Sequence, residues 1–395
     1  AAWRARMADT AIAKNAQVDD QLCFNQLMWD KVNGSGIYPV KPAPGHETDG
    51  RVILGWNGTY TAALPARAIC SGHVYGLQQG ARRRGCIALH LTFVESGYAG
   101  KVWRLQEAGL YALSSGTYQL DNLLSFDAPQ PTLPLPPPRH PDLMPDKPMP
   151  DMAADKRGWS TQTALIWSPR LRAHLDLVGR HIHAIRDAMA ISWSLNRAML
   201  MPKMLCVCER AEAPWTILPT CIKESTSTQL PFVCPLEHIF DIERLVTIGQ
   251  PITTRTKDGR RKPGLHILPW SHLDPDINRN LPPETQNQMK RLLVRWRNGT
   301  TTAAATSTPA APAVPRNGVI WIPRGLTDAG FRQILGPVLR DVQLVHFEST
   351  EGVFGGFETE EDADAFQMMI DRSVLGGFSA TWCCTHANKI GGTFR

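Results

Sequence analysis

The chain has 395 residues; 43% are apolar, 20% are charged, and the formal net charge is +6. This length predicts two or three domains, and the composition supports hydrophobic cores and excludes wholesale disorder. The small positive charge does not indicate a nucleic-acid partner, so none is predicted. No uninterrupted apolar run is long enough to cross a bilayer, so a membrane anchor is expected only upstream of these residues.

Two segments of biased composition divide the chain. Residues 127–150 contain ten prolines, which favour an extended polyproline-II spacer, and residues 300–315 consist almost entirely of Thr, Ala, Pro and Ser. The expected organisation is a first segment, a Pro-rich linker, a second segment, an Ala/Thr/Pro linker and a third segment. Their bounds are 1–126, 127–157, 158–298, 299–315 and 316–395.

The first segment begins with helical patterns over Ala2–Ala16 and Asp20–Trp29. Short strands are predicted at Val52–Gly55 and Ile87–Phe93. The second of these strands is nearly continuous in apolar residues, which predicts that it is buried.

The stretch after this strand carries the strongest chemical signal. His90 offers an imidazole to a divalent metal, and Gly97 and Gly100 allow a ligand to approach the backbone. Lys101 can reach phosphate oxygens, and Trp103 can form a pocket wall. Together these residues predict one end of a metal–diphosphate site. The alternative is a core histidine, a glycine turn and a surface Lys-Arg pair.

Several ordered motifs in this segment resemble plant glycosyltransferase family 77, the extensin arabinosyltransferases. They are Asp20-Gln21-Leu-Cys-Phe24-Asn25, Gly72-His73-Val74, His90-Leu91-Thr92-Phe93, Gly100-Lys101 and Arg104-Leu105-Gln106-Glu107-Ala108. The resemblance implies an α/β fold. It would contain the carboxy-terminal half of a GT-A-type nucleotide-diphospho-sugar transferase domain, followed by α/β extension domains joined by Pro-rich linkers.

The resemblance also implies roles for individual residues. His90 would be a ligand of Mn²⁺, and Gly100, Lys101 and Trp103 would bind a UDP-sugar donor. Asp20 and Gln21 would lie at the transferred sugar or the acceptor hydroxyl. The family's Asp-x-Asp metal motif does not precede Asp20 here, so it is expected upstream of an amino-terminally truncated chain. Two later Asp-x-Asp triplets are interpreted as solvated or capping carboxylates, at Asp274–Asp276 and Asp362–Asp364.

The second segment contains the longest helical pattern, over Leu171–Arg197, which leads into an apolar strand. Its motifs resemble the extension that follows the catalytic domain in the same family, with a weaker likeness to protein O-fucosyltransferases. The motifs are Arg186-Asp187-Ala188, Leu195-Asn196-Arg197, Cys206-Val207-Cys208 and Leu230-Pro231-Phe232-Val233-Cys234-Pro235. His181 and His183 do not share a helix face and are interpreted as structural or surface residues.

Four cysteines of this segment allow three interpretations. Cys206, Cys208, Cys221 and Cys234 form two disulfides in a secretory compartment, bind zinc, or stay as buried thiols. The absence of Cys-x2-Cys pairs favours disulfides over zinc. The preferred pairings link Cys206 and Cys208 to the other two cysteines.

The third segment alternates strands with helices, which predicts a largely parallel sheet. Strands are expected at Val319–Ile322, Gln343–Phe347 and Ser379–Cys384. Helices are expected at Leu326–Leu335, with Thr327 and Asp328 at its start, and at Glu360–Ser373.

The function that this resemblance implies is that of a retaining, UDP-sugar-dependent glycosyltransferase in the Golgi lumen. Its donor would be UDP-arabinofuranose, and its acceptor a hydroxyproline-rich cell-wall glycoprotein. The full-length enzyme would be a type II membrane protein. The alternatives are a non-catalytic carbohydrate-binding or scaffolding protein, or an O-fucosyltransferase-like module.

Overall fold

A computed structural model describes residues 52–54, 60–62, 69–72, 75, 85–91, 94, 96–111, 122–136, 169–207, 230–249, 264–274, 289–297 and 318–373. The chain divides into two compact units, residues 1–69 and 70–395. The described residues of the first unit form an antiparallel pair of strands, β1 (Val52–Leu54) and β2 (Tyr60–Ala62).

A six-stranded sheet organises the second unit, and every strand pair in it is parallel. In spatial order the strands are β11 (Val319–Pro323), β10 (Arg291–Arg297), β13 (Leu344–Phe347), β5 (Leu123–Phe126), β6 (Ala198–Leu200) and β9 (Ile267–Leu268). The prediction of an α/β fold with a largely parallel sheet is confirmed.

The strand order shows how the chain builds this sheet. From β5 the chain moves outward to β6 and β9, and then returns to place β10, β11 and β13 on the other side of β5. The first predicted segment therefore supplies β5, the second supplies β6, β9 and β10, and the third supplies β11 and β13. Residues 127–157 and 299–315 thus connect strands of one sheet.

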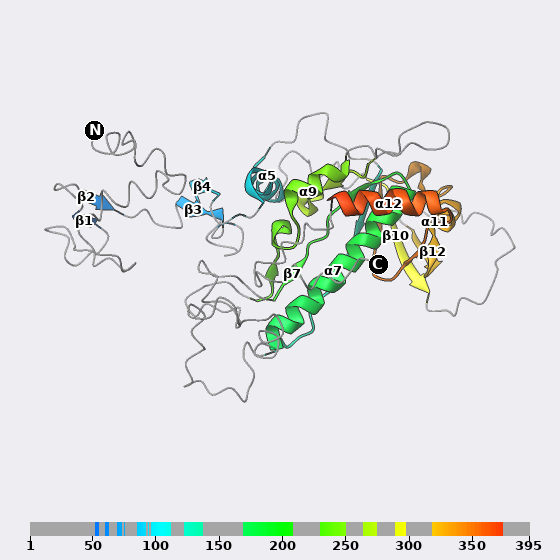
Figure 1. Cartoon of the computed structure of the whole chain (residues 1–395), viewed down its shortest axis with the longest axis horizontal. Helices are drawn as coiled ribbons and strands as arrows, with labels where there is room; N and C mark the ends of the chain where they lie inside the picture. The colour runs from blue at the N-terminus through cyan, green and yellow to red at the C-terminus, as the bar shows by residue number, and fades with distance from the viewer. Residues whose placement is uncertain are drawn as a thin grey trace. The chain divides into compact units, whose positions relative to one another are not determined.

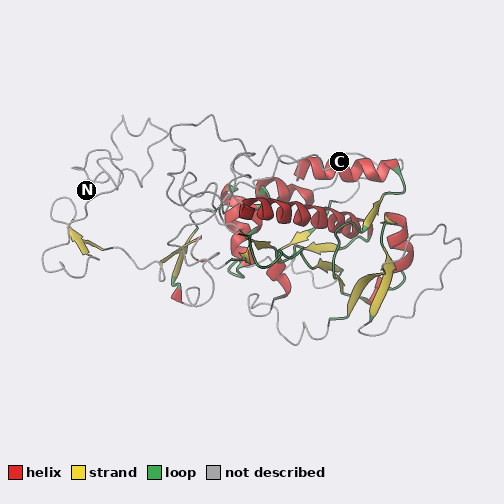
Figure 2. Cartoon of the chain, turned by 90° about the horizontal axis from the view of Figure 1, so that it is seen from below, coloured by secondary structure: helices red, strands yellow, loops and turns green. Residues whose placement is uncertain are grey.

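Helices accompany the strands, and the two longest lie along one side of the sheet (Figure 2). The helices are α5 (Gly97–Glu107), α7 (Pro169–Ser194), α9 (Ile242–Leu245), α11 (Asp328–Leu335) and α12 (Glu360–Ser373). Four 3₁₀-helices are η4 (Leu236–His238), η5 (Val246–Gly249), η6 (Trp270–Leu273) and η7 (Leu339–Asp341). Because α7 and α11 both lie in crossovers that run in the same direction along the sheet, right-handed connection places them on the same face, and they are in contact. Figure 1 shows α12 crossing near the carboxyl end of α7.

The two faces of the sheet carry different side chains, since neighbours along a strand point to opposite faces. On the first face, Leu124, Val345 and Phe347 join the main core with residues of α7 and α12 such as Met189 and Phe366. On the second face a smaller cluster forms. Its buried members are Leu123, Ala198, Leu200, Leu268, Met289 and Leu344.

The end of α7 is fixed by a buried arginine. The sequence pattern predicted a helix to Arg197, but α7 ends at Ser194 because Asn196 adopts a left-handed conformation with φ 51°. This turn directs the side chain of Arg197 toward backbone carbonyls at the start of β5 and ahead of β13, and the residue is 5% exposed. Its guanidinium donates to the carbonyls of Leu123, Leu339 and Val342 at 3.1, 2.9 and 2.8 Å.

The third segment follows its predicted elements closely. Thr327 caps α11, accepting a hydrogen bond of 3.1 Å from the N–H of Gly330, and α12 has the predicted bounds. At the start of α12, the hydroxyl of Thr359 accepts a hydrogen bond of 3.1 Å from the N–H of Asp362 and donates one of 2.9 Å to its carboxylate, so Thr359 rather than Asp362 caps the helix. The predicted strand Ser379–Cys384 lies outside the described residues, as do the helices Ala2–Ala16 and Asp20–Trp29.

Three further two-stranded sheets complete the described part of the chain. Their strands are β3 (Ile69–Ser71) with β4 (Ala88–His90), β7 (Leu205–Cys206) with β8 (Phe232–Val233), and β12 (Leu326–Thr327) with β14 (Phe354–Gly356). The prediction that the strand around Leu89 is buried is wrong. Ile87 is 86% exposed and β4 has no buried residue; among the described strands, β4 pairs with β3. Among the described helices, none is both long and apolar enough to cross a membrane.

Candidate functional site

His90, the predicted metal ligand, lies at the end of β4 with an exposed side chain. Within the described residues, it belongs to no group of three or more His, Cys, Asp or Glu side chains close enough to share an ion. The described residues therefore supply His90 as one candidate ligand without a three-ligand group around it. A manganese site here would need further ligands from outside the described residues.

Helix α5 carries the three residues predicted to bind the donor, but it points them in different directions. Lys101 is exposed, whereas Gly100 and Trp103 are buried. Residues two apart on a helix do not face each other, so Lys101 and Trp103 cannot line one pocket. Tyr98, one turn before Lys101, is 76% exposed and shares its face.

The start of α5 is shaped by a contact with α9. Gly97 has φ +52°, and a Cβ atom there would lie 2.7 Å from Oε1 of Glu243. The hydroxyl of the preceding Ser96 accepts a hydrogen bond of 3.0 Å from the N–H of Ile242. The missing side chain at Gly97 thus leaves room for Glu243 of α9. Since the Glu243 carboxylate faces this helix end, Lys101 is the feature of α5 best suited to meet a diphosphate.

The opposite side of α5 is anchored by a buried polar cluster. Arg104 pairs with Glu237 of η4 and donates a hydrogen bond of 3.2 Å to the carbonyl of Gly72. The indole of Trp103 donates to Oε1 of Glu107 at 3.1 Å. Burial, and then the nearby Glu237, raise the pKa of Glu107 to about 8. The motif residues Arg104 and Glu107 therefore hold the helix in place.

A cavity of about 390 Å³ lies between α5 and the segments around η5 and β9. Its walls are mostly apolar and include Val102, Trp103, Leu245, Leu265 and Pro269. Trp103 lines this cavity together with Tyr98, whereas Lys101 is not among its lining residues, so the cavity is not the predicted diphosphate pocket.

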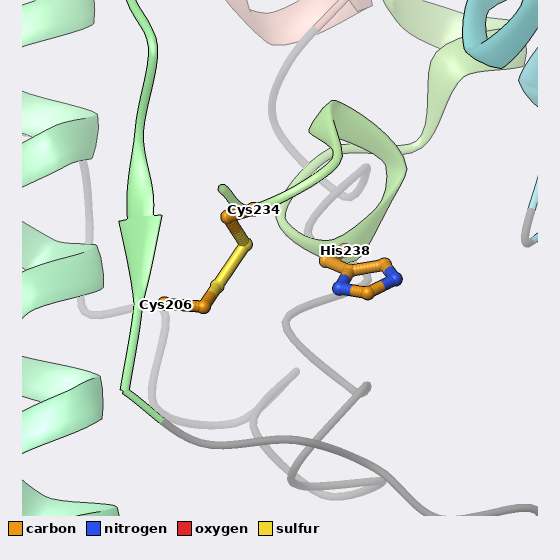
Figure 3. Close-up of side chains that lie close together, drawn as sticks. All are labelled: Cys206, Cys234 and His238. Carbon is orange, nitrogen blue, oxygen red and sulfur yellow. A yellow bond between two sulfur atoms is a disulfide. The ribbon is translucent and has the colours of Figure 1, made fainter. Parts of the chain in front are cut away.

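The cysteine cluster lies beside α7, in the pair formed by β7 and β8. Cys206 and Cys234 form a disulfide, with a Cα–Cα distance of 5.0 Å, and the imidazole of His238 lies beside it (Figure 3). The two sulfurs and a ring nitrogen of His238 lie within 4.8 Å of one another. Because the sulfurs are bonded to each other, they are not thiolate ligands for zinc here. Cys208 and Cys221 lie outside the described residues.

A second disulfide, which the sequence did not indicate, joins Cys70 of β3 to Cys86, with a Cα–Cα distance of 5.9 Å. It closes a loop of 16 residues ahead of β4. The two disulfides give the chain a covalent framework of the kind found in proteins of oxidising compartments.

The second face of the sheet carries polar residues that the sequence did not single out. Ser125 of β5 and His346 of β13 are register partners, and Oγ and Nδ1 lie 2.9 Å apart. Nε2 of His346 lies 3.4 Å from Oδ2 of Asp127, and both Ser125 and His346 line a cavity of about 640 Å³. A serine and a histidine within short, mostly apolar strands give no distinctive sequence spacing, so only their pairing reveals them.

Comparison with known proteins finds a similar plant arabinosyltransferase. The chain is 26% identical over 393 residues to the arabinosyltransferase XEG113 of Arabidopsis thaliana, an alignment that covers 99% of this chain. The chain resembles the extensin arabinosyltransferases of family 77. It spans about half the length of this curated relative, since the alignment covers 52% of XEG113. No family profile and no solved structure matches the chain.

Several motif residues of this arabinosyltransferase-like chain are structural anchors. Asp187 is buried, and its carboxylate accepts hydrogen bonds of 3.1 and 3.5 Å from the N–H groups of Val353 and Phe354. Desolvation raises the pKa of Asp187. Asp187 thus ties α7 to the start of β14, and Arg197 ties the end of α7 to β5 and to the segment from η7 to β13. The predicted catalytic residues Asp20 and Gln21 lie outside the described residues.

Proposed function

We propose that the chain is part of a retaining glycosyltransferase that transfers arabinofuranose from a UDP-sugar to a hydroxyproline-rich cell-wall glycoprotein. The observation that carries this proposal is the similarity to an arabinosyltransferase along nearly the whole chain. The ordered motifs from Asp20 to Ala108 support it. The two disulfides are consistent with the Golgi lumen as its compartment.

The proposed donor site belongs to a GT-A-type domain and uses the exposed face of α5. Lys101 would meet the negative charge that develops on the departing UDP, because a mobile ammonium is an effective partner for phosphate oxygens. Asp20 and Gln21 would position the transferred sugar or the acceptor hydroxyl. A manganese ion, for which His90 would supply one ligand, would withdraw charge from the diphosphate when bound.

Sugar transfer by the full-length protein tests this proposal. The assay mixes UDP-arabinofuranose with an arabinosylated hydroxyproline peptide and follows the mass of the peptide. Lys101→Ala should lower kcat by about 100-fold if it stabilises the leaving group, as the loss of one charge-stabilising donor does in other enzymes. Lys290→Ala, which removes another exposed lysine, is the matched control and should leave kcat unchanged.

His90→Ala tests the metal assignment separately. It should abolish the dependence of UDP binding on manganese while the protein remains folded. Unchanged manganese dependence would reject His90 as a ligand. Glycan binding without any sugar transfer by the full-length protein would instead favour the non-catalytic carbohydrate-binding alternative.

A further inference from the structure

The second face of the sheet brings three strands together around one histidine. The register places His346 of β13 between Ser125 of β5 and Leu293 of β10, and all three line the same cavity. Their side chains point away from the main core, which lies on the other face. No residue of α5 lines this cavity, although η6, which supplies Trp270 and Leu273 to it, packs against α5.

The imidazole of His346 is held from both sides. Nε2 lies 3.4 Å from Oδ2 of Asp127, and Nδ1 lies 2.9 Å from Oγ of Ser125, so each ring nitrogen faces a polar partner. One third of His346 and two thirds of Asp127 remain exposed. The ring is thus fixed in direction while the cavity stays open to a ligand.

The cavity combines an apolar floor with a mixed set of polar groups. Leu200, Leu293 and Leu344 contribute the floor, and the polar rim holds both donors and acceptors. The polar and aromatic lining residues are Ser125, Lys203, Trp270, Asp274, Arg291 and His346. A few polar groups above apolar walls are typical of small-molecule sites.

The distribution of charge favours a neutral polyol over an anion. The ammonium of Lys203 lies 4.9 Å from the ring centroid of Trp270, and the carboxylate of Asp274 lines the same cavity. Asp127 adds a second carboxylate behind His346. The cations Lys203 and Arg291 are offset by the carboxylates of Asp274 and Asp127, so the site has no excess of positive charge to select an anion, and sugar hydroxyls, which both donate and accept hydrogen bonds, suit this mixture.

The location agrees with where open parallel sheets bind ligands. Lys203 follows β6 and Trp270 follows β9, so both come from the carboxyl ends of strands. The connection from β5 leads to β6 on one side of the sheet, and the connection from β10 leads to β11 on the other side. Open parallel sheets bind ligands near the point where the connections change direction in this way. Trp321 of β11, which is 46% exposed on the same face, extends the surface beyond the cavity.

We propose that this cavity binds the neutral arabinose oligosaccharide of the acceptor, with Ser125 and His346 as the groups that contact its hydroxyls. Asp127 is a positioning residue that acts through His346. The choice of glycan rests on the proposed function; the polyol chemistry of the site does not.

Titration of the full-length protein with a short neutral arabino-oligosaccharide, followed by calorimetry, tests this site. His346→Ala should weaken binding by about tenfold, as the loss of one hydrogen-bonding partner does. Asp127→Asn, which changes a side chain that is 65% exposed, should weaken binding several-fold and change its pH profile. His183→Ala, at an exposed histidine of α7, is the matched control and should bind as the unmodified protein does.

Two further arms separate this site from the donor site. Lys101→Ala should lose sugar transfer but keep oligosaccharide binding, and UDP alone should not displace the oligosaccharide. If transfer fails in every variant while binding still depends on His346 and Asp127, only the proposed function is rejected. Displacement by UDP, binding that both His346→Ala and Asp127→Asn leave unchanged, or no binding by the unmodified protein would overturn the site.

Discussion

Arg104 of α5 and Glu237 of η4 form an ion pair in which both side chains are almost fully buried, although 133 residues separate them in the chain. Glu237 follows Cys234 by three residues, and the disulfide partner of Cys234 is Cys206 of β7. The ion pair therefore joins the helix that carries Lys101 to the covalently fixed segment beside α7.

Breaking this pair should strongly destabilise the protein. Glu237→Gln or Arg104→Met each leaves a buried charge without its counter-ion, which typically costs about 3–5 kcal/mol. The double variant Arg104→Met/Glu237→Met should cost less than the two single changes together. The free energy of unfolding in urea measures each loss.

The exposed pair of Arg180 and Glu351 provides the control. Its nitrogen and oxygen lie 3.3 Å apart and its side chains are 47% and 33% exposed, so Arg180→Met should cost about 0–1 kcal/mol. Equal losses for Arg180→Met and Arg104→Met would contradict the assignment of the buried pair.

Glu107 should make the stability of the protein depend on pH. Its pKa is raised from 4.5 to about 8, so the folded state holds a proton that the unfolded state releases at lower pH. The stabilisation from this group is complete below about pH 4.5 and is lost as the pH rises through about 8. Glu107→Gln keeps an oxygen acceptor for Trp103. Between pH 4.5 and about 8, its melting temperature should fall less than that of the unmodified protein. Glu358→Gln, at an exposed carboxylate, should not change the slope.

The elements that the sequence predicted well are those whose signals are local. The cap at Thr327 and the acidic first turn of α12 define their helices without help from distant residues. The pairing of β5 with β13 could not be predicted, because 221 residues separate Ser125 from His346. For the same reason the proline-rich breaks suggested separate segments, although the strands on either side of them share one sheet.

The predicted donor site shows a different limit. The sequence grouped Gly100, Lys101 and Trp103 into one donor site, but this stretch is helical and its periodicity separates the side chains. The buried character of the strand before His90 was inferred from composition alone. Whether apolar residues are covered depends on which strands pair with them, and among the described strands β4 pairs with β3.

Arg197 should be among the most sensitive positions in the chain. It is a buried cation whose guanidinium donates to carbonyls of β5 and of the connection from η7 to β13. Arg197→Met leaves these carbonyls unsatisfied and should cost at least about 3 kcal/mol. Arg197→Lys keeps the charge but loses the planar guanidinium, so its loss of stability should lie between zero and that of Arg197→Met.

Urea unfolding measures this series, and Arg340→Lys, at an exposed arginine of η7, is the control that should change nothing. A loss for Arg197→Lys no larger than that for Arg340→Lys would show that the guanidinium contacts contribute little.

The disulfide between Cys206 and Cys234 gives the last prediction, and it bears on the compartment. It closes a loop of 28 residues, and bonds of this kind contribute roughly 2–4 kcal/mol. Without reductant, alkylation of the folded protein should leave both cysteines unmodified, and a chelator should not change the melting temperature. The double variant Cys206→Ala/Cys234→Ala should melt at the same lower temperature as a reduced protein that retains Cys70–Cys86. Alkylation of both thiols in the untreated protein, with melting that a chelator lowers, would instead assign the two sulfurs and His238 to a metal. That outcome would also remove the support that this disulfide gives to an oxidising lumen.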